Sequence, residues 1–240
     1  MSKTLTRILA MLQGILILTA AALFTVNLCC FRHSFYEREY AKLHTAADMG
    51  MSHEDLMEAT DALLDYLKGY RFDLSLQTTV NGETVEMFDA REKAHMADVR
   101  SLYRRAMAAG WLALGLALML NSLLTFKGDR KTALKGVLGG FGLFAIFLGA
   151  AAIYAAIDFN SFWTNFHRLF FDNDLWLLYP EERLIQMVPE QFFSDLVTRI
   201  VALFAAIAAA LTAGNLIMQK SYQKRAPLGS LGEGAVSEAD

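Results

Sequence analysis

Four long apolar runs without a single charged residue constrain this chain more than any other feature. They are Ile8–Leu28, Ala106–Phe126, Val137–Ile157 and Ile200–Met218. A helix needs roughly 20 mainly apolar residues to cross the hydrocarbon core of a bilayer. The pattern therefore predicts an all-α membrane protein with four transmembrane helices, over about 8–28, 106–126, 137–157 and 200–218.

The first run also has the features of a secretory signal peptide, because Lys3 and Arg7 precede it. Its apolar part is longer than that of an ordinary signal peptide, and no clear small-x-small cleavage site follows it. A retained helix is the favoured interpretation. We expect one membrane-embedded domain over 1–220 and a disordered cytoplasmic tail over 221–240.

The basic residues near the ends of the runs predict the orientation of the chain. Lys127, Arg130, Lys131 and Lys135 lie in the short connection between the second and third runs, with only Asp129 against them. Lys and Arg next to a span favour the cytoplasmic side. Both termini are therefore expected in the cytoplasm, and the loops 32–105 and 158–199 are expected on the extracytoplasmic side.

The first large loop carries signals of folded structure. Ser52 is a typical N-cap residue, and leucines at helical spacing lead from it to Gly69, a typical helix stop. Alternating apolar residues around Asn81-Gly82 predict a β-hairpin. Asp89 then precedes a stretch without helix breakers, so a helix from Ala90 is expected to continue into the second span.

The second large loop is rich in aromatic residues, which favour the membrane interface. We expect this segment to lie at headgroup depth, and Pro189-Glu190 to begin the helix of the fourth span. The aromatic residues are Phe159, Phe162, Trp163, Phe166, Phe170, Phe171, Trp176 and Tyr179.

Two of the five histidines stand out by their positions. His95 lies shortly before the second span and His167 shortly after the third. These two spans are joined by a short connection, so both histidines are expected on the same face of the membrane. Histidine is the side chain that most often acts as a general acid or base. The ordinary alternatives are a histidine on a solvated helix face and a histidine packed among interfacial aromatic rings.

Five further residues are candidates for supporting roles. Glu92 and Asp98 are each three residues from His95, which is within reach on one helix face, so either carboxylate is placed to hold a ring nitrogen. Around His167 the candidates are Trp163, Arg168 and Trp176.

Several other classes of protein lack their sequence signatures in this chain. No nucleophile elbow, metal-binding H-E-x-x-H helix, P-loop or dinucleotide fingerprint is present, and no spacing supports a metal site. No span carries an acid or base at mid-membrane, which disfavours an ion-coupled transporter. The adjacent Cys29 and Cys30 fit neither a disulfide framework nor a thiol-redox motif.

The segments around the two histidines resemble those of a known family, the bacterial lipoprotein intramolecular transacylases (Lit), which are four-span membrane proteins. The order of the motifs along the chain is also similar, up to about Lys220. The similar motifs are Glu92-x-x-His95-Met96-x-Asp98-Val99-Arg100, Phe166-His167-x-x-Phe170-Phe171, Trp176, Leu184-Ile185 and Pro189-Glu190-x-Phe192-Phe193.

The resemblance implies an activity and a pair of catalytic residues. Members of the family move the sn-2 acyl chain of a diacylglyceryl-modified N-terminal cysteine to the α-amino group of that cysteine, which gives a lyso-form lipoprotein. Their two essential histidines match His95 and His167. One histidine would act as the base on the amine, and the other would stabilise the oxyanion or protonate the leaving oxygen; a covalent acyl-histidine is also open.

The expected partners follow from this activity. They are diacylglyceryl-modified lipoproteins and membrane lipids, with no nucleic acid, and the expected location is the bacterial cytoplasmic membrane with the active site on its extracytoplasmic side. No cofactor is expected, because converting an ester to an amide is downhill. The main alternative is a non-catalytic membrane scaffold or sensor whose outer loop binds a partner. An intramembrane peptidase is disfavoured because no span contains a catalytic pair.

Overall fold

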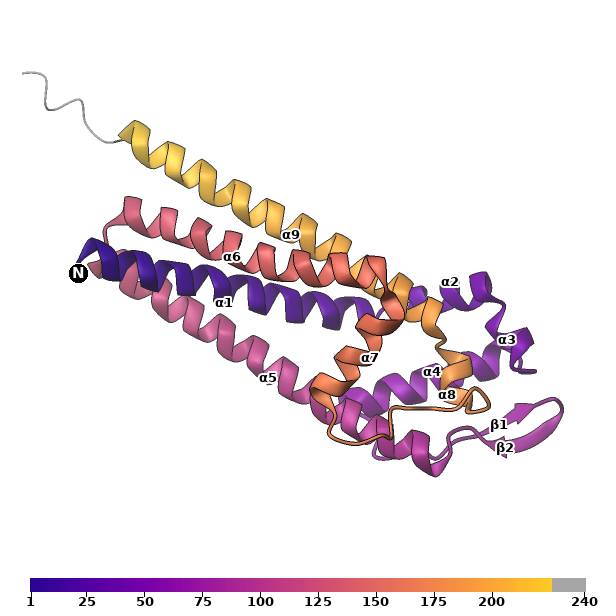
Figure 1. Cartoon of the computed structure of the whole chain (residues 1–240). Helices are drawn as coiled ribbons and strands as arrows, with labels where there is room; N and C mark the ends of the chain where they lie inside the picture. Colours follow the sequence, from indigo (N-terminus) through magenta and orange to yellow (C-terminus); the bar gives the residue numbers. More distant parts are fainter. Residues whose placement is uncertain (226–240) are drawn as a thin grey trace, which may run out of the picture. The chain divides into compact units, whose positions relative to one another are not determined.

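The computed structural model of the chain describes residues 1–225, and these are mostly helical (Figure 1). Four helices are long and apolar enough to cross a membrane, and they contain the four predicted spans. They are α1 (Lys3–Cys30), α5 (Ala90–Lys127), α6 (Arg130–Ile157) and α9 (Glu190–Arg225). Helix α9 includes the first five residues of the predicted tail, and 226–240 lie outside the described residues.

The described chain forms two compact units. The first consists of Met1–Leu18, Leu114–Ile146 and the part of the chain from Ala205 onward, and the second consists of Thr19–Ala113 and Phe147–Phe204. Both predicted histidines belong to the second unit.

Glycines hold α1 and α6 together in the first unit. A Cβ atom on Gly140 would lie 2.2 Å from the carbonyl oxygen of Met11, and a Cβ on Gly14 would lie 2.4 Å from that of Val137. Such distances are far shorter than a van der Waals contact, so the two backbones approach as closely as they do only because these side chains are absent. Small residues serve the same purpose wherever transmembrane helices pack tightly.

We expect Gly140→Val to destabilise the protein by about 1–3 kcal/mol, because the added side chain must push α1 and α6 apart. Gly142→Val is the matched control, since a Cβ on Gly142 meets nothing within 4 Å. Thermal unfolding of the purified protein in detergent measures both variants. Equal melting temperatures for the two would contradict this account of the packing.

Three short helices and a hairpin follow α1 in the second unit. They are α2 (His33–Leu43), α3 (Thr45–Asp48), α4 (His53–Lys68) and the strands β1 (Gln77–Val80) and β2 (Glu83–Glu86). The side chain of Ser52 accepts a hydrogen bond from the backbone of Asp55 at the start of α4. Strands β1 and β2 pair antiparallel around Asn81-Gly82, where both residues have positive φ angles.

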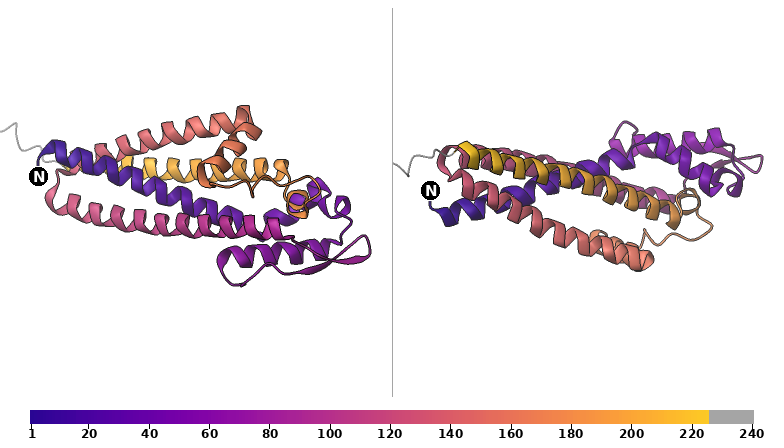
Figure 2. Two further views of the ribbon diagram at one scale, coloured as in Figure 1. Left: turned by 60° about the horizontal axis from the view of Figure 1, so that its bottom comes forward. Right: turned by 90° about the horizontal axis from the view of Figure 1, so that it is seen from above.

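Two more helices, α7 (Phe159–Phe170) and α8 (Arg183–Met187), lie in the second large loop. The sequence predicts an interfacial segment there but assigns no helix to it. The side chain of Asp158 caps α7 by accepting a hydrogen bond from the backbone N–H of Ser161. Helix α5 is continuous over its whole length, as the left view in Figure 2 shows.

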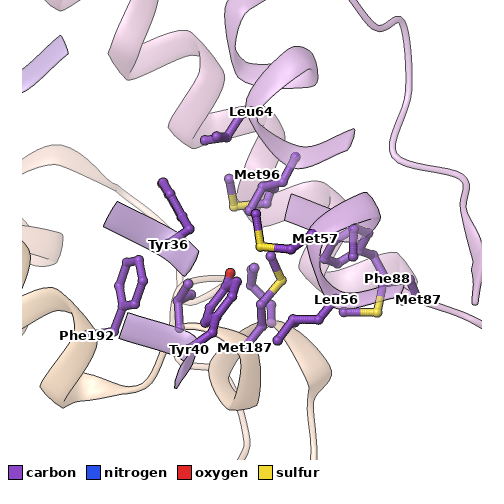
Figure 3. Close-up of a cluster of buried hydrophobic side chains, with 14 of the residues drawn as sticks. Tyr36, Tyr40, Leu56, Met57, Leu64, Met87, Phe88, Met96, Met187 and Phe192 are labelled. Atoms are coloured by element: carbon purple, nitrogen blue, oxygen red, sulfur yellow. The ribbon is translucent and has the colours of Figure 1, made fainter. Parts of the chain in front are cut away.

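The second unit has a hydrophobic core built from residues far apart in the chain (Figure 3). Leu56 and Met57 come from α4, Met96 comes from α5, Met187 comes from α8 and Phe192 comes from α9. Met187 is fully buried and Phe192 is 1% exposed. The core therefore anchors the start of α5, which carries His95, and the end of the segment that leads from α7 into α9.

Candidate active site

His95 lies near the start of α5, in the part of this helix that precedes its charge-free span. Helix α5 has 38 residues and is therefore about 57 Å long, whereas a bilayer core is about 30 Å thick. Residues 90–105 accordingly extend beyond the membrane-spanning segment 106–126. His95 is only 7% exposed, and its Nδ1 atom is buried without a hydrogen-bond partner.

His167 lies in the last turn of α7 and is also 7% exposed. Its Nδ1 atom lies 2.8 Å from the carbonyl oxygen of Trp163, one turn earlier in the helix. A carbonyl oxygen can only accept a hydrogen bond, so Nδ1 carries the proton and donates it. In the neutral ring, Nε2 is then the unprotonated nitrogen, which is the nitrogen that can act as a base.

The structure brings the two histidines together. Their ring centroids are 6.1 Å apart and the ring planes are inclined by 36°. Phe171 contacts both, with centroid distances of 5.5 Å to His95 and 5.6 Å to His167. Trp176 stacks on His167 at 5.0 Å, while Trp163 meets its ring at 4.8 Å in an edge-on contact. The pair is thus enclosed by aromatic rings from α7 and from the segment after it.

This environment lowers the pKa of each histidine. Burial is the largest cause for His95, the neighbouring His167 adds to it, and Asp98 opposes it, so that the pKa of His95 falls to about 4. Burial also lowers the pKa of His167, against a smaller opposing effect of the hydrogen bond to Trp163. Because a low-dielectric surrounding disfavours the charged ring, both histidines are neutral near pH 7.

The model of one protein family, described as lipoprotein intramolecular transacylase Lit, matches residues 11–193 of this chain. The chain belongs to this family. By its description, this is a family of acyltransferases that act on lipoproteins, and the match confirms the resemblance found in the sequence.

Solved structures of a Lit protein from Bacillus cereus have the same fold as this Lit family member. One, described as a membrane integral lipoprotein intramolecular transacylase, is 21% identical, has a TM-score of 0.77, and the match covers 93% of this chain and 99% of that one. A variant with a histidine replaced by alanine is 20% identical, has a TM-score of 0.76 and is matched over 92% of this chain and 96% of its own. No curated protein sequence matches the chain.

Glu92, expected beside His95, is instead bonded to backbone groups. It is 1% exposed, and its carboxylate accepts hydrogen bonds from the backbone N–H groups of Asp89 at 2.6 Å and Leu184 at 2.5 Å. Burial raises the pKa of Glu92, although both hydrogen bonds work in the opposite direction. Through these two hydrogen bonds Glu92 connects the start of α5 to α8, and we call this connection the clamp.

The other predicted supporting residues occupy different surroundings. Asp98 accepts a hydrogen bond from the side chain of Asn173 at 2.8 Å and influences His95 through its charge. Trp163 stacks on Phe166 and contacts Phe193 of α9. Trp176 covers one face of His167, whereas Arg168 is exposed.

Sequence reasoning does not single out Arg91, which fastens the segment that carries Trp176. Its guanidinium donates hydrogen bonds to the backbone carbonyls of Asp174 at 2.7 Å and Leu177 at 3.0 Å. These partners are more than 80 residues away in the chain, so no local sequence pattern predicts the contact. Within residues 1–225, no cluster of three or more His, Cys, Asp or Glu side chains is arranged to hold a metal ion.

The low pKa of His95 predicts how stability depends on pH. Between about pH 6.5 and pH 4 the unfolded chain binds a proton at this residue while the folded chain does not, so the free energy of unfolding falls as the pH is lowered. The interval from 6.5 to about 4 corresponds to roughly 3 kcal/mol.

Unfolding in detergent at pH 7 and pH 4.5 measures this effect as the difference between the wild type and His95→Gln, which cannot titrate. We expect the variant to lose less stability on acidification than the wild type. His53→Gln, a change at an exposed histidine, is the control and should behave as the wild type does. Identical pH dependence in all three proteins would show that His95 is not buried in its neutral form.

Proposed function

We propose that this protein moves the sn-2 acyl chain of a diacylglyceryl-modified N-terminal cysteine to the α-amino group of the same cysteine. The product is an N-acyl, S-monoacylglyceryl lipoprotein. The observation that carries the proposal is the pair of buried histidines, His95 and His167, with ring centroids 6.1 Å apart in a member of the Lit family.

The tautomer of His167 suits it to the role of base. The Nδ1–H group of His167 is directed at the carbonyl of Trp163, so Nε2 is free to accept a proton. Nε2 takes this proton from the substrate's α-amino group while the α-amino nitrogen attacks the ester carbonyl. A carbon–nitrogen bond forms, the bond from the carbonyl carbon to the glyceryl oxygen breaks, and that oxygen leaves with the proton. His167 returns to its neutral form when the leaving oxygen takes the proton, and the amine is consumed as the amide forms. The step therefore balances without a cofactor.

His95 is then the group that stabilises the negative charge developing on the ester carbonyl oxygen. A neutral imidazole can donate its N–H to an oxyanion, and a water-poor surrounding strengthens such a bond. Because donor and acceptor belong to one substrate molecule, the remaining task of the enzyme is to orient them. The stacked rings of Trp163 and Phe166 on α7 offer an apolar surface for the acyl chains.

The basic residues near the spans support an orientation with both termini in the cytoplasm and the histidines on the extracytoplasmic side. Mature lipoproteins present their modified cysteine at that surface of the membrane. The proposed surroundings of the site are therefore the interface between lipid and water, with membrane lipids in contact with α7.

Tandem mass spectrometry of lipoprotein N-terminal peptides tests this function. A bacterial host that lacks its own N-acyltransferase would be compared with and without the chain. Transfer leaves the peptide mass unchanged but moves one acyl group onto the nitrogen, and the fragment ions distinguish the two forms. Peptides that remain in the diacyl form, with the protein correctly inserted, would favour a non-catalytic scaffold or sensor.

A further inference from the structure

A small polar cavity of about 190 Å³ opens next to the histidine pair. It lies between the start of α5 and the chain that follows α7. The residues that matter for its chemistry are Asp98, Ser101, Arg105, Phe171, Asp172 and Asn173.

The cavity and the histidines share walls. Phe171 lines the cavity and has ring contacts of 5.5 Å with His95 and 5.6 Å with His167. Asp98, another lining residue, follows His95 by three residues on α5, so the two side chains lie on one face of the helix. The cavity is therefore lined by a side chain that contacts both rings.

The charges of the cavity favour a cation. Two carboxylates, those of Asp98 and Asp172, stand against one guanidinium, that of Arg105. Asn173 donates one hydrogen bond to Asp98 at 2.8 Å, which leaves acceptor positions on a group that has about four. Nearby, the Nδ1 atom of His95 has no hydrogen-bond partner, and this residue is more than nine-tenths buried.

The cavity is small and open on one side. A water molecule takes about 30 Å³ of liquid volume, so the space has room for roughly six non-hydrogen atoms. This accommodates an amino group, its α-carbon and the adjoining peptide group.

We propose that this cavity binds the α-ammonium group of the substrate's N-terminal cysteine, with the carboxylate of Asp98 as its principal contact. The inference rests on the proposed function and extends it to recognition of the substrate. An α-amino group has a pKa of about 7.7–8.0 and is largely protonated at pH 7, so a carboxylate binds it well.

The same contact discriminates between substrate and product. The bound ammonium first releases one proton to water, because only the neutral amine can attack, and the second proton passes through His167 to the leaving oxygen. After acyl transfer the nitrogen is a neutral amide with a bulky substituent. Asp98 then holds it poorly, and the product leaves. Asp98 thus selects lipoproteins whose terminal nitrogen is still free.

Binding of two unreactive lipopeptides tests the inference. Both carry an ether in place of the sn-2 ester, which cannot be transferred, and they differ only in having a free or an acetylated α-amino group. We expect the wild type to bind the free amine at least about tenfold more tightly at pH 7, and Asp98→Asn to lose most of that preference. Asp174→Asn removes one negative charge from the segment after α7 without altering the cavity lining, and it should keep the preference.

The outcomes separate this inference from the proposed function. Equal binding of the two lipopeptides by the wild type, or an unchanged preference in Asp98→Asn, would overturn the assignment of the cavity while leaving the transfer reaction intact. Failure of the wild type to bind either lipopeptide would overturn both. Should Asp98→Asn not fold, the comparison of the two lipopeptides with the wild type still tests the inference, and Asp172→Asn, at an exposed lining residue, should reduce the preference for the free amine by a smaller factor.

Discussion

Alanine in place of either His95 or His167 is expected to slow acyl transfer by a factor of about 10²–10⁴, the range that a well-placed acid or base contributes. The two rings are buried side by side, neutral and enclosed by aromatic groups, so no other described side chain replaces either one. Single-turnover formation of the lyso-form peptide by the purified protein, followed by mass spectrometry, measures the effect.

The double variant is informative because residues that act as a unit are not additive. If one histidine removes the proton and the other stabilises the charge that results, His95→Ala with His167→Ala should cost little more than the worse single change. His53→Ala, at an exposed histidine of α4, is the matched control and should retain full activity. Single variants that stay within about threefold of the wild type, with normal folding, would exclude a catalytic role for the pair.

Membrane topology predicts that the two histidines lie on one face of the membrane, but it does not predict their contact or their surroundings. His95 and His167 flank adjacent spans joined by a short connection, which places them on the same face, and α7 then carries His167 to His95. The rings of Phe171 and Trp176, which enclose the pair, come from a segment after α7 that has no regular structure. No periodicity in the sequence determines the path of such a segment.

Helix α7 shows where sequence patterns fall short. Its twelve residues hold five aromatic rings, counting Phe159, Phe162, Trp163, Phe166 and Phe170, which indicate an interfacial location but suit several backbone conformations. The helix is specified by the Asp158 cap and by stacking of Trp163 against Phe159, Phe166 and Phe193. The last of these contacts is long-range and invisible in the local sequence.

Glu92 illustrates a pattern with two interpretations. Its spacing from His95 suits a partner of the ring, yet Asp89-x-x-Glu92 at a helix start is also the spacing of a capping box. The structure has that box, since Glu92 N–H donates to the side chain of Asp89 at 2.8 Å while Asp89 N–H donates to the side chain of Glu92 at 2.6 Å. The bond to Leu184 adds a second function that only the tertiary fold reveals.

Replacing Glu92 with alanine is therefore expected to reduce stability by about 1–3 kcal/mol. The change leaves the buried N–H group of Leu184 without its acceptor, and a buried donor without a partner costs about this much, whereas the N–H of the exposed Asp89 can bind water instead. Glu92→Gln should be intermediate, because its amide has one oxygen where the carboxylate has two. Denaturant or thermal unfolding in detergent gives the values.

The consequence for activity distinguishes a clamp from a partner of His95. Leu184 lies at the start of α8, and the segment between α7 and α8 carries Trp176, which stacks on His167. Loss of the clamp should therefore lower activity and stability together, and substrate or a stabilising lipid should restore part of both. Glu58→Ala, an exposed glutamate of α4, should change neither. A Glu92 variant of normal stability but strongly reduced activity would instead place this carboxylate in the chemistry, acting on His95 as its spacing first suggests.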